Sequence, residues 1–162
     1  MDNMEIYALH TARINGERAD AAQSQLKSIL NRSVKEFSSA EITHIGSYAF
    51  YGCRSLISLD LPNLTNIGIY AFSGCESLTA LDFPNLASIN QNGFRNCTSL
   101  GTLVLRASTA CTLGVNGLMN TAIAGGSGYI YVPDSLVNTY KAASEWSTYA
   151  AQIKPLSEYE EA

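Results

Sequence analysis

Apolar and polar positions along the chain repeat at a step of 22 residues. Residues 46–67 and 68–89 are identical at 14 of 22 aligned positions, and residues 90–111 keep several of the same apolar positions in phase. Within each repeat, L-x-x-L-x-[LF]-P alternates apolar and polar residues, which predicts a short strand with one buried face. Because one repeat cannot bury that face alone, the pattern predicts stacked repeats whose strands pair in a parallel sheet.

Five columns of equivalent residues run down the chain at this step. They are Phe50, Phe72 and Phe94; Cys53, Cys75 and Cys97; Leu56, Leu78 and Leu100; Leu59, Leu81 and Leu103; and Ile45, Ile67 and Ile89, with Cys111 as the next member. We expect the leucine columns and Leu61 with its equivalents to point into one core, and the phenylalanines to form a ladder on the opposite wall. Asn63 and Asn85 are expected to start the turn that follows each strand.

The repeated motif L-x-x-L-D-[LF]-P-N-L-x-x-I-G-x-Y-A-F-x-G-C resembles the BspA-like, Treponema-type leucine-rich repeat over about residues 38–133. The A-F-x-x-C element makes the resemblance specific, because common leucine-rich repeats lack it. The tail that starts at Tyr131 is similar to a recurrent ending of such proteins from gut bacteria and their prophages. The resemblance implies a right-handed leucine-rich-repeat solenoid of α/β class, with mostly short parallel strands. It also implies a bacterial binding and adhesion module that is extracellular or exposed on the cell surface.

We divide the chain into three parts. Residues 1–37 form a leader and a helical N-terminal segment, residues 38–133 form the solenoid, and residues 134–162 form a helical C-terminal cap with an acidic tail. Apolar residues at three-four spacing predict a helix over residues 17–30. This helix either packs on the N-terminal side of the solenoid or forms a short coiled coil through which the chain is a homo-oligomer.

The repeat becomes irregular towards its C-terminal end. We expect an insertion around Thr112–Asn116 and a last strand within residues 129–133. Asp134 or Ser135 can cap a helix that runs to about Ala143.

A second helix is expected after Ser144, which can cap it. It contains Trp146, Tyr149 and Ile153, and Pro155 helps to end it. A solenoid needs its open core end covered, and we expect Trp146 to be the plug.

The net charge of the chain argues against one class of partner. Ten Lys and Arg residues against 14 Asp and Glu give a net charge of −4, so we expect no nucleic-acid partner. The acidic start at residues 1–5 leads into no apolar run, so we expect no signal peptide here. No stretch approaches the roughly 18 apolar residues of a membrane span.

The cysteine column could form disulfides, because stacked repeats bring Cα atoms close together. We favour buried free thiols, since equivalent side chains point the same way and three in a row cannot all pair. A 22-residue step also lacks the short C-x₂₋₄-C spacing of a zinc site. We expect Cys111 to be buried as well, and no metal to be bound.

The remaining polar motifs do not predict an enzyme. His44 is expected to face solvent, His10 lies in the leader, and neither has triad partners nearby in the sequence. Asp60 and Asp82 are stacked equivalents but lack the opposed geometry that a glycosidase needs. The G-G-S-G segment at residues 125–128 precedes a strand rather than a helix, so it is a turn and no phosphate loop. We therefore expect no catalytic residues and no cofactor.

The candidate binding site is the concave face of the predicted sheet, because curved repeat proteins bind partners there. Strand alternation places these side chains on that face: Ser58, Asp60, Ala80, Asp82, Thr102, Val104, Tyr129 and Tyr131. The predicted function is a non-catalytic binding or adhesion module for a protein or glycan partner. The alternative is a distal structural or receptor-binding domain of a prophage tail or virion protein.

Overall fold

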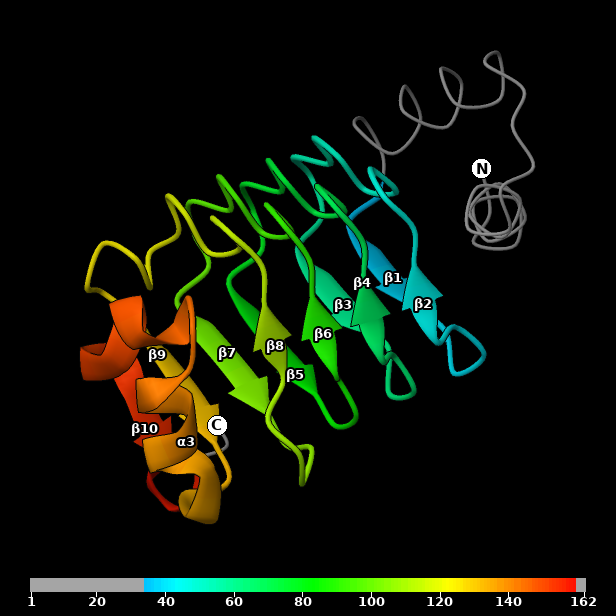
Figure 1. The fold of residues 1–162 in the computed structure, drawn as a ribbon. Coiled ribbons are helices and arrows are strands. Elements are labelled where there is room, and N and C mark those ends of the chain that lie inside the picture. The colour runs from blue at the N-terminus through cyan, green and yellow to red at the C-terminus, as the bar shows by residue number, and fades with distance from the viewer. Residues whose placement is uncertain (1–33, 160–162) are drawn as a thin grey trace.

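The computed structural model describes residues 34–159, and these residues form two walls of short parallel strands (Figure 1). One wall, the strand wall, contains β1 (Glu36–Ser38), β3 (Ser58–Asp60), β5 (Ala80–Phe83), β7 (Thr102–Leu105), β9 (Tyr129–Val132) and β10 (Ile153–Pro155). The other, the short-strand wall, contains β2 (His44–Ile45), β4 (Asn66–Ile67), β6 (Ser88–Ile89) and β8 (Thr112–Leu113). The segments that return from the second wall to the first form a third side, the turn edge (residues 46–57, 68–79, 90–101 and 114–128).

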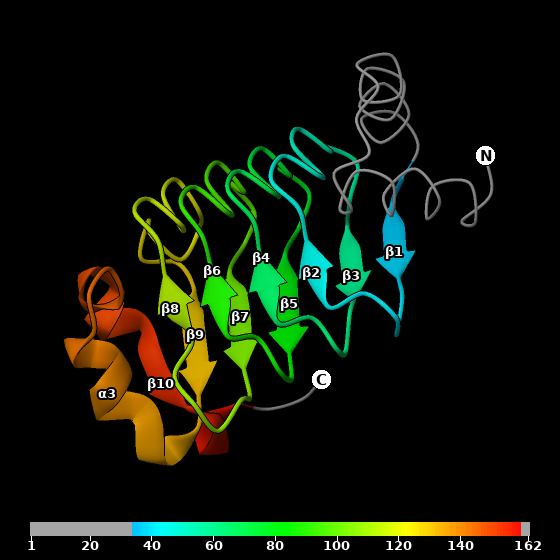
Figure 2. The same cartoon turned by 45° about the vertical axis from the view of Figure 1, so that its right-hand side comes forward.

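The strand pairing reproduces the sequence step. Glu36 pairs with Ser58, and Ala80 pairs with Thr102, so partners are 22 residues apart. Strand β3 also lies beside β5, which continues the wall. Figure 2 shows that neighbouring strands of each wall come from successive repeats. Each repeat therefore makes one circuit through both walls and the turn edge.

The predicted columns fill the space between the walls. Phe72 stacks between Phe50 and Phe94, with ring centroids 5.0 Å and 5.3 Å apart and interplanar angles of 16° and 6°. The leucine and isoleucine columns are buried, except that Leu59 is only partly buried at the N-terminal end of the described core. Stacking gives every middle repeat an apolar neighbour on both sides, which one repeat cannot provide.

The cysteines form the buried ladder that the spacing predicts. All four are free thiols inside the core. The Cys75 thiol donates to the carbonyl of Phe50 at 3.2 Å, and the Cys97 thiol donates to the carbonyl of Phe72 at 3.1 Å. Burial raises the pKa of the Cys75 thiol, and the neighbouring thiols of Cys53 and Cys97 raise it further.

The insertion in the fourth repeat lies earlier than the sequence suggests. The step is still 22 where Phe83 pairs with Leu105, but it is 24 where Ser88 pairs with Thr112. The two extra residues therefore lie in the loop of residues 106–111, and the predicted insertion around Thr112–Asn116 is wrong. As a consequence Leu113, rather than Cys111, pairs with Ile89 and continues the isoleucine column.

The first part of the C-terminal cap is helical, as predicted, but the predicted side chains do not cap the N-terminus of its helix. It consists of a 3₁₀ helix, η1 (Asp134–Leu136), and the α-helix α3 (Val137–Ala142), and neither has a side-chain N-cap. The Asp134 carboxylate instead accepts from the backbone N–H of Ser157 at 3.0 Å, in η3 (Leu156–Glu158). The prediction that Asp134 or Ser135 caps this helix is therefore wrong, because Asp134 ties the C-terminal segment to the cap.

The second part of the cap ends sooner than predicted. The 3₁₀ helix η2 (Trp146–Gln152) follows Glu145, which has a φ of 65° and no side-chain cap bond, so Ser144 does not cap it. Ile153 does not belong to the helix. It begins β10, which pairs in parallel with β9 and is buried beside Ile130. A strand at the edge of a sheet leaves backbone N–H and C=O groups without hydrogen-bond partners. By pairing with β9, β10 satisfies these groups on that strand.

Trp146 closes the end of the core, as predicted. Its side chain is 1% exposed, and its indole N–H donates to the Cys111 carbonyl. At the other end, β1 begins at Glu36, two residues inside the segment assigned to the leader. The predicted helix over residues 17–30 and His10 lie outside the described residues.

Candidate functional site

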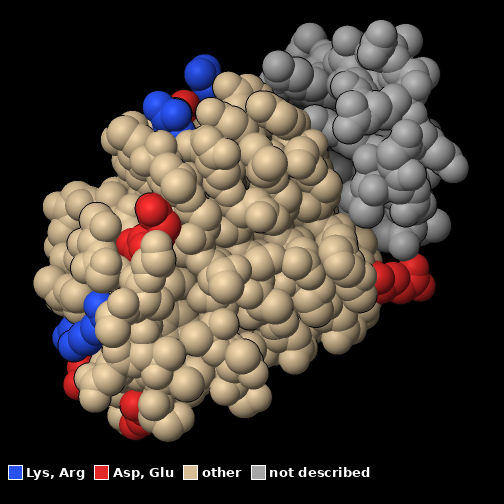
Figure 3. Space-filling view, viewed as in Figure 1, with Lys and Arg blue, Asp and Glu red and all other residues tan. Residues whose placement is uncertain are grey.

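The short-strand wall presents a polar face without charge. None of its strand residues is Lys, Arg, Asp or Glu, and the charged groups on this side of the molecule lie towards the cap and along the edges (Figure 3). Polar side chains on this wall form hydrogen bonds with one another. The Thr65 hydroxyl donates to Asn66 Oδ1 at 2.9 Å, and the Asn66 amide donates to Ser88 Oγ at 2.6 Å. His44 is exposed here, as predicted, and lies 2.8 Å from the Thr43 hydroxyl.

The strand wall carries the eight residues of the predicted binding face, and seven of them reach the surface. Five are exposed: Ser58, Asp60, Ala80, Asp82 and Tyr129. Thr102 and Tyr131 are partly buried. We call this outward side the strand-wall face.

Val104 is the exception, because it is only 1% exposed. It lies between Asp82 and Tyr131 in the sheet register, outside the main core cluster. The ring of Tyr159 packs on Tyr131 with centroids 4.9 Å apart, and the Arg106 guanidinium lies 5.8 Å from the Tyr159 ring. The C-terminal segment therefore lies over Val104, and the prediction that Val104 is exposed on this face is wrong.

Asp82 is held in an ion pair that the sequence did not predict. Arg106 Nε lies 2.8 Å and 3.0 Å from the two carboxylate oxygens of Asp82, and Arg106 Nη2 lies 2.8 Å from Oδ2. Both oxygens accept from the guanidinium, so this carboxylate orients Arg106 towards Tyr159. The side chains remain 33% and 42% exposed for Arg106 and Asp82, so the pair stays within reach of a partner.

A second cation lies at the β10 edge of the same face. The Lys154 ammonium is 4.5 Å from the centre of the Tyr129 ring, within the range of a cation–π interaction. Tyr129 in turn packs against Tyr131 at 6.2 Å between centroids. Lys154 also lies 3.5 Å from Glu158. This edge therefore combines two aromatic rings with a cation.

The opposite edge of the face is acidic. Asp60 is exposed, and within residues 34–159 its carboxylate has neither a hydrogen-bond donor nor an ion-pair partner. Glu36 is the exposed first residue of the adjacent strand β1. The strand-wall face thus changes from carboxylates near β1 and β3 to tyrosines and cations near β7, β9 and β10.

Three residues of this face escaped the sequence prediction: Arg106, Lys154 and Tyr159. Arg106 occupies the position equivalent to Pro84 and follows Val104 by two residues, so it shares the same side of the strand as Val104. Lys154 and Tyr159 were assigned to a helix and a tail. Only the pairing of β10 with β9 brings them beside Tyr129 and Tyr131.

Neither a cluster of metal-binding side chains nor a membrane-spanning helix is found among the described residues. No group of three or more His, Cys, Asp or Glu side chains could hold a metal ion in this part of the chain. Between residues 34 and 159, no helix has the length and apolar character needed to cross a membrane.

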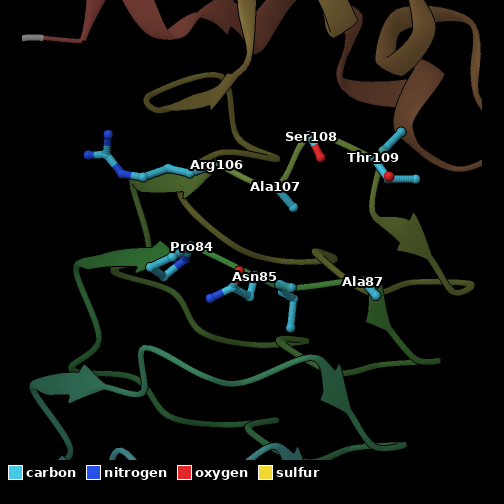
Figure 4. Close-up of a pocket in the computed structure, with 9 residues that line it drawn as sticks. Pro84, Asn85, Ala87, Arg106, Ala107, Ser108 and Thr109 are labelled. Carbon is cyan, nitrogen blue, oxygen red and sulfur yellow. The ribbon is translucent and has the colours of Figure 1, made fainter.

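A cavity of about 470 Å³ opens between the loops that follow β5 and β7. Figure 4 shows Pro84, Asn85 and Ala87 on one side, Ala107 to Thr109 on the other, and the Arg106 side chain extending away from both. Earlier repeats close this space with an asparagine: Asn63 donates to the Ala40 carbonyl and Asn85 to the Pro62 carbonyl, each at 2.8 Å. Ala107 occupies the position equivalent to Asn85 in the irregular repeat, and its side chain cannot donate a hydrogen bond. The cavity therefore marks the irregular repeat and has no charged group directed into it.

A family model described as a BspA type leucine rich repeat region matches residues 25–140 in six copies. This range includes every strand from β1 to β9 and extends into the cap. No curated protein and no solved structure matches the chain.

Proposed function

Because the chain belongs to the family of BspA-type leucine-rich repeats, we propose that it is a non-catalytic adhesion module that recognises a partner through the strand-wall face. Repeat families of this type are generally binding modules without enzymatic activity. We further propose that the stacked repeats form one short solenoid, whose partner is a protein or a glycan on a bacterial or host cell surface.

The contrast between the two walls supports this choice of face. In the middle of the short-strand wall, Thr65, Asn66 and Ser88 are already hydrogen-bonded to one another. The strand-wall face instead presents the exposed Tyr129 beside Lys154, and Asp60, whose carboxylate has no partner among residues 34–159. Tyrosine and arginine are enriched among the residues that dominate binding energy at interfaces, and this face carries both.

The charge change across the face favours a partner with the reverse order of charges. A cationic group would lie against Asp60 and Glu36, and an acidic or aromatic group would lie against Lys154 and Tyr129. Such complementarity raises association rates and fixes the orientation of the partner. Binding should therefore weaken as salt increases, because both ends of the face are exposed to solvent.

Capture from an extract of bacterial or host cell surfaces tests the proposal. The double variant Asp60→Ala/Tyr129→Ala should reduce capture by the immobilised protein about tenfold or more. The matched control is Asn66→Ala/Ser88→Ala, which alters the short-strand wall and should leave capture unchanged. Equal loss in both variants, or full retention in the first with an intact fold, would contradict the assignment of this face.

The alternative function, a distal domain of a prophage tail or virion protein, stays a prediction. It depends on oligomerisation through residues 17–30, which lie outside the described part of the chain. Light scattering on the full chain tests it directly. A trimer or other closed oligomer would favour the tail domain, and a monomer at all concentrations would count against it.

A further inference from the structure

Three tyrosines cluster on the turn edge, away from the strand-wall face. Tyr48 and Tyr70 stack with centroids 5.1 Å apart and planes inclined by 12°. The ring of Tyr51 contacts both at an inclined angle. Its centroid lies 5.7 Å from that of Tyr48, with 54° between the planes, and 6.2 Å from that of Tyr70, with 67° between the planes. Tyr48 is 45% exposed and Tyr51 is 39% exposed. Two parallel rings and a third inclined ring thus form a partly exposed aromatic corner.

The backbone at this corner is unfavourable for aromatic residues. Tyr48 and Tyr70 have φ values of 62° and 55°, in the left-handed region that bulky side chains rarely adopt. The equivalent positions of the next two repeats hold Asn92 and Asn116, with φ values of 57° and 58°. Asparagine is the residue type that tolerates this conformation. Strained positions of this kind concentrate at binding and catalytic sites, so the exposed rings point to a function beyond stability.

The charges near the corner cancel. Arg54 follows Tyr51 by three residues, and its Nε lies 3.2 Å from the carboxylate of Glu76 in the next repeat. Both side chains are well exposed, at 74% and 48%. The adjoining strands of the short-strand wall carry no charge (Figure 3). Among residues 34–159, the charged side chains that follow the corner in the sequence are thus paired, and a surface with paired charges does not attract a strongly charged ligand.

We propose that Tyr48, Tyr51 and Tyr70 form a binding site for a neutral, β-linked oligosaccharide. A pyranose ring whose substituents are equatorial has flat faces of C–H groups, and their slightly positive hydrogens are attracted to the negative face of an aromatic ring. The hydroxyl groups around the sugar need donors and acceptors, which the tyrosine hydroxyls and the Arg54–Glu76 pair supply. A proline-rich peptide fits less well, since it docks into grooves lined by aromatic rings, and the stacked pair leaves no slot between Tyr48 and Tyr70.

This site is separate from the strand-wall face and does not rest on the function proposed for that face. Calorimetric titration with cellotriose and with chitotriose tests it. At least one of these trisaccharides should bind with a Kd of about 1 mM or below. The double variant Tyr48→Asn/Tyr70→Asn places in both positions the residue that the later repeats use. It should weaken sugar binding about tenfold or more, while its unfolding midpoint stays equal to or above that of the wild type.

Val115→Ala removes a 53% exposed apolar side chain from the turn edge of the fourth repeat, so it is the matched control and should bind the trisaccharide with unchanged affinity. Tyr51→Ser removes a ring without touching a left-handed position, and it gives the same test should the double variant lose its fold. The proposal is overturned if neither trisaccharide binds the wild type or if affinity is unchanged in the tyrosine variants. It is equally overturned if the cluster binds a proline-rich decapeptide and no sugar.

Discussion

The indole N–H of Trp146 donates a hydrogen bond of 2.7 Å to the backbone carbonyl of Cys111. The phenol oxygen of Tyr140 accepts from the N–H of the same residue, also at 2.7 Å. The two rings meet edge to face, with centroids 5.3 Å apart and planes at 81°. Both backbone groups of Cys111 are therefore satisfied by cap side chains, which also bury the end of the core.

Variants of Trp146 should separate these two contributions. Trp146→Phe keeps most of the apolar contact but leaves the Cys111 carbonyl unpaired, and should destabilise the protein by about 1–3 kcal/mol. Trp146→Ala also opens a cavity and should reduce stability by about 3–5 kcal/mol. Denaturant unfolding followed by circular dichroism measures both, since the chain has no other tryptophan to report fluorescence. Unchanged stability in Trp146→Phe would show that the hydrogen bond contributes nothing, and equal effects of the two variants would show that the apolar contact adds nothing to it.

The phenylalanine ladder should be most sensitive in its middle. Phe72 is fully buried between two stacked rings, so Phe72→Ala should lower the free energy of unfolding by about 3–5 kcal/mol. Ile69, three residues earlier, is 42% exposed on the turn edge. Ile69→Ala is the control and should change stability by no more than about 0.5 kcal/mol. A small effect at Phe72 would mean that the ladder is less tightly packed than the structure shows.

The cysteines should be unreactive in the folded protein. A thiol reagent at pH 8 should modify almost none of the four buried thiols in native conditions and all four after denaturation. Fewer than four reactive thiols in the denatured, unreduced protein would instead reveal a disulfide.

Stability should also decline at alkaline pH. Burial raises the pKa of Cys111 from 9.0 to about 12, and it raises the pKa of Tyr140 from 10.0 to about 12. Below pH 9 the Cys111 thiol is neutral in both states, and its contribution to stability is fully present. As the pH rises towards 12 the unfolded state loses this proton first, so the contribution is lost. Cys111→Ala should flatten this decline between pH 9 and 12 without abolishing it, because burial also raises the pKa values of Cys75, Tyr140 and Tyr149. Unfolding midpoints across that range measure the change.

The C-terminal segment should be released when its aromatic contact is removed. Tyr159 packs on Tyr131, so Tyr131→Ala should speed chymotryptic cleavage after Tyr159 and expose Val104. Mass spectrometry detects the loss of the last three residues. Tyr129→Ala, which lacks a ring contact with Tyr159, should be cleaved at the wild-type rate. Equal cleavage of both variants would contradict a role for the Tyr131 ring in holding the segment.

For the core columns and the strand register, sequence reasoning succeeded where a residue had a counterpart in the next repeat. The Phe72 and Cys75 columns, the parallel register of the strands and the outward position of Asp60 all follow from the step of 22. It failed where the step changed or the repeat stopped. Cys111 was assigned to the isoleucine column because two inserted residues have no counterpart that would reveal their place. Ile153 was assigned to a helix because local spacing says nothing about a free strand edge beside Ile130.

The sequence by itself determined the family, the repeated strands and the apolar columns, since these depend on a local pattern that each repeat satisfies in the same way. Tertiary structure decided which outward residues are available. Val104 and Asp82 occupy equivalent positions, yet one is covered by the C-terminal segment and the other is held by Arg106. It also decided that Tyr48, Tyr51 and Tyr70 meet in one corner. Such contacts join segments whose relative positions no local periodicity specifies, because they arise only once the repeats are stacked and the cap is folded back.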